Sequence, residues 1–233
     1  FDARFNTSLE CIEVDDVSYS NSNWPKKDAI SSYSTNCDGV DPQELTYVPD
    51  NNFEQALIDL GYDDILDDYV STNNISVVTV LDLKDKDIDD LTGIESFIDL
   101  TTLNCSKNNL SSLDLSNNLS LTYLNCSLND LINLDISNNL LITNLISFYN
   151  NLESLNVKNG NNTSFTNFDA RFNTSLECIE VDDVSYSNSN WLKKDETSSY
   201  STNCDGVDSP ELTYVPDNNF EQALIDLGYD DIL

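Results

Sequence analysis

Apolar and polar positions repeat every 21 residues through the middle of the chain. Residues 100–120 (LTTLNCSKNNLSSLDLSNNLS) align with residues 121–141 (LTYLNCSLNDLINLDISNNLL) and 142–162 (ITNLISFYNNLESLNVKNGNN), and weaker copies cover residues 80–95 and 165–183. One column of this alignment is filled by large apolar side chains: Leu81, Leu103, Leu124, Leu145 and Phe168. Because a fixed period of this length is typical of stacked repeats, the pattern predicts a solenoid.

Each copy contains two short segments in which apolar and polar residues alternate, such as LNC and LDL. Alternation with a period of two is typical of strands. A coil of this length cannot bury its own apolar side, but coils stacked about 4.8 Å apart can do so. We therefore predict two short strands in each coil.

Small and polar residues form further columns of the same alignment. Cys105 and Cys126 occupy an inward column, where we expect them to pack as small, reduced apolar groups. An asparagine column is predicted to satisfy backbone groups at a bend, where strand pairing ends: Asn108, Asn129, Asn150 and Asn173. A second column of this kind holds Asn118 and Asn139, and the period continues it at Gly160.

These columns resemble leucine-rich repeats, in the 21-residue form with a cysteine ladder that occurs in some bacterial internalins. The resemblance covers residues 75–183 and implies a leucine-rich-repeat solenoid with short parallel strands on two faces of each coil. Two coils carry the ladder cysteine, and the last coil has two inserted residues around 160–163.

Both ends of such a solenoid need a cap over the apolar core. Residues 48–61 (VPDNNFEQALIDLG) predict a helix with Asp50 as N-cap and Gly61 just past its end. Its apolar stripe comprises Phe53, Ala56, Leu57 and Leu60. Residues 184–204 are expected to cover the other end, with Tyr186 and Trp191 packing on the coils. The whole arrangement resembles modules of secreted or surface proteins of the Bacteroidota group.

Residues 1–66 recur as residues 168–233 with only five differences. We therefore expect a segment of a longer tandem array, an expectation that the lack of methionine supports. One complete module is predicted at 46–204, divided into a helical cap (46–74), coils (75–183) and a C-terminal cap (184–204). The remaining parts are the end of a preceding module (1–37), linkers (38–45 and 205–212) and the capping helix of a following module (213–233).

Four cysteines lie outside the inward column. Cys178 precedes Cys204 by 26 residues, and Cys11 precedes Cys37 by the same number. We predict that each pair forms a disulfide, which would stabilise a loop-rich cap by about 3–4 kcal/mol on the chain-entropy estimate; four free thiols are the alternative. Because disulfides persist in oxidising compartments, this prediction favours a secreted protein or the bacterial cell surface.

Charge and composition exclude several classes of function. The chain has 42 acidic and 10 basic residues, a formal net charge of -32, and no histidine. Nucleic acids and anionic membranes are bound by clustered cations, so neither is an expected partner, and no apolar run is long enough to insert in a membrane. Without histidine, the Ser-His-Asp and Cys-His catalytic systems are impossible. We expect no enzyme.

One outward strand face gathers large apolar groups, which we call the contact face: Tyr123, Leu128, Ile146, Phe148, Tyr149 and Phe172. A cluster of this kind indicates a contact surface for a neighbouring module, a like chain, or a surface protein or glycan. The alternative is that the tail or a linker covers it. Elsewhere, an acidic row (Asp114, Asp135, Asn156, Glu180) and several Asp pairs leave calcium open as a ligand, although no calcium-loop motif is present and no cofactor is expected.

The function that these features favour is mechanical and multivalent. We expect a structural or adhesive module of an extracellular tandem-repeat surface protein, in which repetition multiplies weak contacts. The alternative is a ligand-binding leucine-rich-repeat domain that recognises a protein or glycan through its strand face. The two differ in whether the contact face stays open in the assembled array.

Overall fold

A computed structural model of the chain describes residues 3, 11–15, 17–24, 26, 32–34 and 45–204. The chain divides into two compact units, Phe1–Thr202 and Asn203–Leu233. The expected linkers (38–45 and 205–212) and the expected following helix (213–233) lie almost entirely outside the described residues. Within those residues, no helix is long and apolar enough to cross a membrane.

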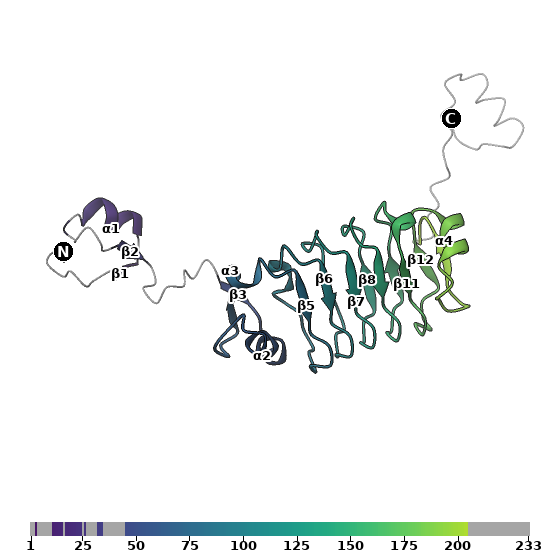
Figure 1. Cartoon of the computed structure of the whole chain (residues 1–233), viewed down its shortest axis with the longest axis horizontal. Coiled ribbons are helices and arrows are strands. Elements are labelled where there is room, and N and C mark those ends of the chain that lie inside the picture. The colour runs from purple at the N-terminus through teal and green to yellow at the C-terminus, as the bar shows by residue number, and fades with distance from the viewer. Residues whose placement is uncertain are drawn as a thin grey trace, which may run out of the picture. The chain divides into compact units, whose positions relative to one another are not determined.

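The predicted leucine-rich-repeat solenoid is confirmed. Its first sheet has the order β11-β9-β7-β6-β5 and is parallel throughout. The strands, each three residues long, are β5 (Val80–Asp82), β6 (Thr102–Asn104), β7 (Tyr123–Asn125), β9 (Asn144–Ile146) and β11 (Asn167–Asp169). The central residues of these strands are Cα partners and all are buried, so one column of apolar side chains, four leucines and Phe168, runs from coil to coil. Figure 1 shows the short strands of successive coils side by side.

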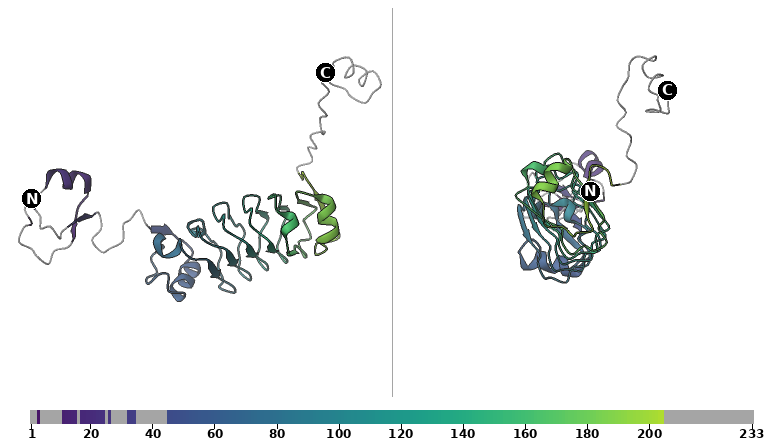
Figure 2. Two further views of the ribbon diagram at one scale, coloured as in Figure 1. Left: turned by 45° about the horizontal axis from the view of Figure 1, so that its top comes forward. Right: turned by 90° about the vertical axis from the view of Figure 1, so that its right-hand side faces the viewer.

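A second parallel sheet, of order β13-β12-β10-β8, occupies the other face of the coils. Its strands are β8 (Asn133–Asp135), β10 (Ser154–Asn156), β12 (Cys178–Glu180) and β13 (Ser199–Ser201). Viewed along the stack, successive coils overlay one another (Figure 2). The segment around Leu113 does not form the expected second strand, although the next coil has a strand, β8, at the matching position. The first coil has a 3-10 helix, η2 (Ile94–Ser96), and no second strand.

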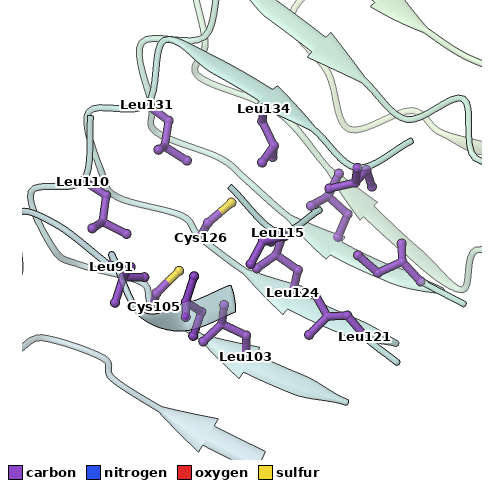
Figure 3. Packing of buried hydrophobic residues seen from close by; sticks show 14 of the residues in the cluster. Leu91, Leu103, Cys105, Leu110, Leu115, Leu121, Leu124, Cys126, Leu131 and Leu134 are labelled. Atoms are coloured by element: carbon purple, nitrogen blue, oxygen red, sulfur yellow. The ribbon is translucent and has the colours of Figure 1, made fainter. Parts of the chain in front are cut away.

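The space between the two sheets is filled by columns of apolar side chains (Figure 3). Leu103 and Leu124 point into it from the first sheet, Leu134 from the second, and Cys105 and Cys126 lie between them. All five are essentially inaccessible to solvent. Because one fully buried leucine contributes roughly 1.5–3 kcal/mol, the stacked columns are the main source of stability.

The N-terminal cap contains the predicted helix, α2 (Asn51–Asp59). Asp50 Oδ1 accepts from the N–H groups of Asn52 and Phe53, as an N-cap should, and Gly61 adopts φ +81° beyond the helix end. Leu60, expected on the buried stripe, is instead 46% exposed, because the helix ends before it. Phe53 and Leu57 are fully buried as expected, and so is Glu54, which the stripe did not include.

Other elements of this cap were not predicted. An antiparallel pair, β3 (Leu45–Tyr47) with β4 (Tyr69–Ser71), is followed by a short helix, α3 (Thr72–Ile75). The cap lies directly against the first coil: a Cβ at Gly93 would come within 2.9 Å of the Tyr47 carbonyl oxygen. Asp50 Oδ2 also accepts from the N–H groups of Asp89 and Asp90, so this carboxylate joins the helix to the first coil.

The C-terminal cap consists of β12, helix α4 (Val184–Asn190) and β13. Trp191 is buried against Phe168, with ring centroids 4.5 Å apart. The disulfide between Cys178 and Cys204 is confirmed. The Asp195 carboxylate accepts hydrogen bonds from the backbone N–H groups of Phe172 and Asn173 in the last coil. In earlier coils such N–H groups bond to carbonyls of the following coil, so Asp195 takes the place of those carbonyls at the end of the stack.

The N-terminal segment contains the same local structure as this cap. Here β1 (Cys11–Glu13) pairs in parallel with β2 (Ser32–Ser34), and α1 (Val17–Asn23) lies between them in sequence. The Tyr33 hydroxyl donates to the Trp24 carbonyl, as the Tyr200 hydroxyl donates to Trp191. Cys11 is disulfide-bonded, and its expected partner, Cys37, lies outside the described residues.

Candidate functional site

The asparagine column ties each coil to the one before it. Asn129 Nδ2 donates to the carbonyls of Cys105 and Cys126, both at 3.0 Å, and its Oδ1 accepts from the Leu110 N–H, also at 3.0 Å. Corresponding bonds are made by the other members of the column, Asn108, Asn150 and Asn173. All four are buried. Each amide therefore satisfies polar groups that would otherwise be stranded in the core.

The second asparagine column does not continue at Gly160. Asn118 and Asn139 are fully buried and donate to carbonyls of the preceding coil. In the next coil two residues share this role. Asn159 Nδ2 donates to the Asn139 carbonyl at 3.0 Å, and the carbonyl that closes the turn belongs to Asn162, the first residue of the 3-10 helix η3 (Asn162–Ser164). The two inserted residues shift the register, and Gly160 adopts φ +75° with no atom within 4 Å of a would-be Cβ.

The ladder cysteines are buried free thiols. Burial raises the pKa of Cys126 to about 12, and burial together with neighbouring Cys126 raises the pKa of Cys105 well above its ordinary value. Cys105 Sγ lies 3.6 Å from the Asn125 carbonyl oxygen, to which it can donate. Both groups therefore remain protonated and unreactive in the folded chain.

A column of left-handed residues lies immediately before the asparagine column. Its members have φ between 53° and 62°, a region that bulky side chains rarely adopt: Asp85, Lys107, Leu128, Tyr149 and Phe172. The last three belong to the contact face. Leu128 is 38%, Tyr149 50% and Phe172 45% exposed, whereas Tyr123, Ile146 and Phe148 are half-buried.

Aromatic rings of this column cover one another. The rings of Tyr149 and Phe172 stack with centroids 4.2 Å apart at 9°, and Phe148 meets Tyr149 edge-on at 5.9 Å. The Arg171 guanidinium lies 5.8 Å from the Phe172 centroid. One face of each of these two stacked rings is therefore covered by its neighbour, and Arg171 adds a cation beside Phe172.

The positions that match Phe148 in the two preceding coils are not part of an exposed surface. Ser106 and Ser127 occupy these positions and are buried. Their hydroxyl groups donate at 2.7 Å to the side-chain oxygens of Asn104 and Asn125. The aromatic cluster of Phe148, Tyr149 and Phe172 is thus confined to the later coils, while the coil of Ser127 contributes Tyr123 and Leu128 to the contact face.

A cation is held at the border of the contact face. Arg171 forms a two-point ion pair with Asp169, which is buried, at 2.7 and 2.9 Å. Lys193 lies 4.0 Å from the same carboxylate. Hydrogen bonding to Asp169 raises the pKa of Arg171.

The acidic row lies on the second sheet, where Asp135, Asn156 and Glu180 are in register. Asp114 accepts from the Ser116 backbone N–H, and hydrogen bonds from Ser116 lower the Asp114 pKa. Over the residues that the structure describes, no group of three or more acidic or cysteine side chains is placed to hold a metal ion.

Two surface features were missed by the sequence patterns. An exposed apolar row follows the second asparagine column: Ile98, Leu119 and Leu140. A pocket in the N-terminal cap lies next to Glu54. The signal for the row was a leucine directly after Asn118 and Asn139, and the signal for the pocket was an acidic residue inside the apolar stripe of α2.

Comparison with known proteins supports the repeat assignment. Over 72 residues the chain is 36% identical to Internalin J of Listeria monocytogenes serotype 4b (strain F2365), a stretch that is 31% of this chain and 8% of Internalin J. No known protein-family profile matches the chain.

Two solved structures are similar. The functional domain of InlJ from Listeria monocytogenes, which includes a cysteine ladder, has a TM-score of 0.48 and 30% identity over 59% of this chain and 33% of that one. An internalin (inlF) from Listeria monocytogenes strain 4b F2365 has a TM-score of 0.45 and 19% identity over 60% and 53%. This chain thus spans only part of each protein that it matches. By its coil columns and its match to Internalin J, it is similar to internalin-type leucine-rich repeats with a cysteine ladder.

Proposed function

We propose that the chain is a structural and adhesive part of an extracellular tandem-repeat surface protein, a stalk or fibre body rather than an enzyme. The supporting observation is the continuity of bonding along the coil stack. Leucine and asparagine columns join each coil to its neighbour, and Asp50 and Asp195 close the two ends of the ladder. We expect a stack bonded in this way to resist bending and to carry load along its axis.

Repetition supports the same function. The 66-residue segment at residues 1–66 returns at 168–233, and we infer that a longer array would repeat the coils between these copies, and with them the contact face. Weak contacts repeated along one chain gain avidity through effective concentration. The net charge of -32 keeps such an array soluble and its modules apart. A disulfide-stabilised cap and the match to Internalin J support a secreted or surface location.

The contact face is the proposed adhesive surface, directed at a like chain or a surface protein. Exposed Leu128, Tyr149 and Phe172 supply apolar area, and Arg171 supplies a cation within an acidic protein. The same exposure favours the second candidate, a ligand-binding leucine-rich-repeat domain, if a specific partner covers this face. Both candidates are binding functions without catalysis.

Adhesion measured as a function of module number tests the proposal. Arrays of one, two and four modules are displayed on beads, and bead–bead and bead–cell attachment are counted. We expect attachment to rise more steeply than in proportion to module number, and Tyr149→Ser with Phe172→Ser to abolish it. The matched control, Leu119→Ser with Leu140→Ser, removes exposed apolar groups elsewhere and should leave attachment unchanged. Attachment that is indifferent to module number would contradict the adhesive proposal, and a single module binding one partner tightly would favour the second candidate.

A further inference from the structure

The exposed apolar row lies at one bend of the coils. A hydrogen-bonded turn forms this bend in three successive coils, closed by N–H to carbonyl bonds of 3.1–3.2 Å: Leu100 to Phe97, Leu121 to Asn118 and Ile142 to Asn139. The second residue of each turn is Ile98, Leu119 or Leu140, and these are 57%, 56% and 58% exposed. Val77 lies 21 residues before Ile98, is 66% exposed and extends the row by one position.

Packing inside the module does not account for this row. The residues that fill the core at the bend are its buried neighbours, such as Asn118 and Leu121. Surface turns are normally built from Gly, Pro, Asn, Asp and Ser. In the next coil the turn closed by the Asn162 carbonyl has exposed Thr163 at the same place, so a polar residue fits the position. Aligned aliphatic side chains at such turns indicate a contact outside the module.

The row lies in a strip that has almost no charge. Residues 74–80, 116–122 and 137–143 contain no Asp, Glu, Lys or Arg, although 22% of the chain is charged. Only the coil of Ile98 brings acids close to the row, Glu95 and Asp99. Two copies of a chain with a net charge of -32 repel each other over most of their surface. A strip without charge is therefore where two copies can approach most closely.

The spacing of the row restricts which partner can cover it. Its members follow one another at the coil rise of about 4.8 Å. A helix has a pitch of about 5.4 Å and loses register with such a row after a few coils. The row of a second copy has the same rise, the same aliphatic side chains and the same lack of charge, so the two rows can interdigitate over any number of coils.

We propose that the exposed apolar row is a lateral contact with a second copy of this chain, and that two chains lying parallel pair along it. The pairing rests on the tandem array of the proposed function, in which chains attached to one surface point the same way. The contact face lies at the other bend of the coils, so Leu128, Tyr149 and Phe172 stay free for attachment.

The area of the row makes this pairing depend on module number. Four half-exposed aliphatic side chains form a patch on the order of a few hundred Å², whereas each partner of a stable interface buries about 800 Å². One module alone therefore pairs weakly. In an array, the first contact holds the next two modules close together, so each further module strengthens the pairing.

Sedimentation equilibrium of the full chain, and of arrays of two and four modules, tests the proposal. We expect the full chain to be monomeric where the four-module array is dimeric, and the dissociation constant to fall at least tenfold between two and four modules. Leu119→Ser with Leu140→Ser in every module should abolish pairing. The matched control, Ile65→Ser with Leu66→Ser, removes aliphatic groups that are 57% and 48% exposed in the N-terminal cap and should leave pairing unchanged. A thermal melt followed by circular dichroism should show both variants folded.

Crosslinking locates the contact. In a four-module array, the Leu140→Cys variant should be joined to its counterpart in a second array by a short bismaleimide. The Ser112→Cys variant, at an exposed position away from the row, should not be joined, and buried Cys105 and Cys126 should not react. Because the row lacks charge while the rest of the surface is acidic, raising the salt concentration should strengthen pairing.

Several results would overturn the proposal: no pairing of the four-module array, pairing that survives loss of the row, pairing that weakens with salt, or equal crosslinking at Ser112. Tyr149→Ser with Phe172→Ser should leave pairing intact. Loss of bead attachment with pairing retained, or of pairing with attachment retained, therefore shows which of the two contacts fails.

Discussion

Replacing Asn129 with alanine is the sharpest test of how the coils hold together. The side chain is 7% exposed and makes three hydrogen bonds at 3.0 Å, one accepted from Leu110 and two donated to the carbonyls of Cys105 and Cys126. At about 0.5–1.5 kcal/mol each, these three bonds account for about 1.5–4.5 kcal/mol. Because the Leu110 N–H would be left buried without an acceptor, we expect a total loss of about 3–5 kcal/mol.

Urea denaturation followed by circular dichroism measures this loss as a change in the free energy of unfolding. Asn109→Ala is the matched control, since Asn109 is exposed and its amide donates only to Asp89, at 2.9 Å. That variant should change stability by no more than about 0.5 kcal/mol. If Asn129→Ala cost less than about 1 kcal/mol, or no more than the control, the asparagine column would not be what joins the coils.

Three further predictions concern the cysteines and one surface acid. Reducing the bond between Cys178 and Cys204, or replacing both by serine, should lower the free energy of unfolding by about 3–4 kcal/mol in a denaturant titration; an unchanged midpoint would contradict the role of the disulfide in the cap. Because burial raises the pKa of Cys126 to about 12 and that of Cys105 well above normal, neither should be alkylated by iodoacetamide at pH 8 until the chain unfolds, as peptide mass spectrometry would show. Asp114 has a lowered pKa, so it adds stability at neutral pH that disappears as pH falls through its folded pKa. Asp114→Asn should therefore be less stable than the parent at pH 7 and equal to it at strongly acidic pH, and a gap that persists in acid would refute this.

The columns of the solenoid could be predicted because each coil repeats the same contacts. Once Leu103 and Leu124 align in sequence, period-two alternation fixes which side chains point inward, and stacking requires the same type of residue one coil above and below. The caps were less predictable. Leu60 fits the apolar stripe of α2, yet the helix ends before it, and Glu54 is buried because two backbone N–H groups of the following loop bind its carboxylate. Such a tertiary partner leaves no periodic signal.

The insertion in the last coil shows a second limit of the pattern. Counting 21 residues from Asn139 leads to Gly160, but the chain absorbs the two extra residues in the turn and places Asn162 at the corner. The contact face had a related limit. Its apolar composition was visible in the sequence, whereas the stacking of Tyr149 on Phe172 depends on left-handed backbone that non-glycine residues seldom adopt.

Single-molecule stretching of a tandem array, with and without reductant, tests the central claim of a load-bearing, disulfide-closed coil stack most directly. Cys178 and Cys204 lie 26 residues apart, so an intact disulfide withholds that segment from extension. At about 3.3–3.6 Å per residue, reduction should lengthen the contour released per module by roughly 90 Å, and each module should resist force before it opens. Smooth extension without resistance, or the same contour length in both conditions, would contradict the account.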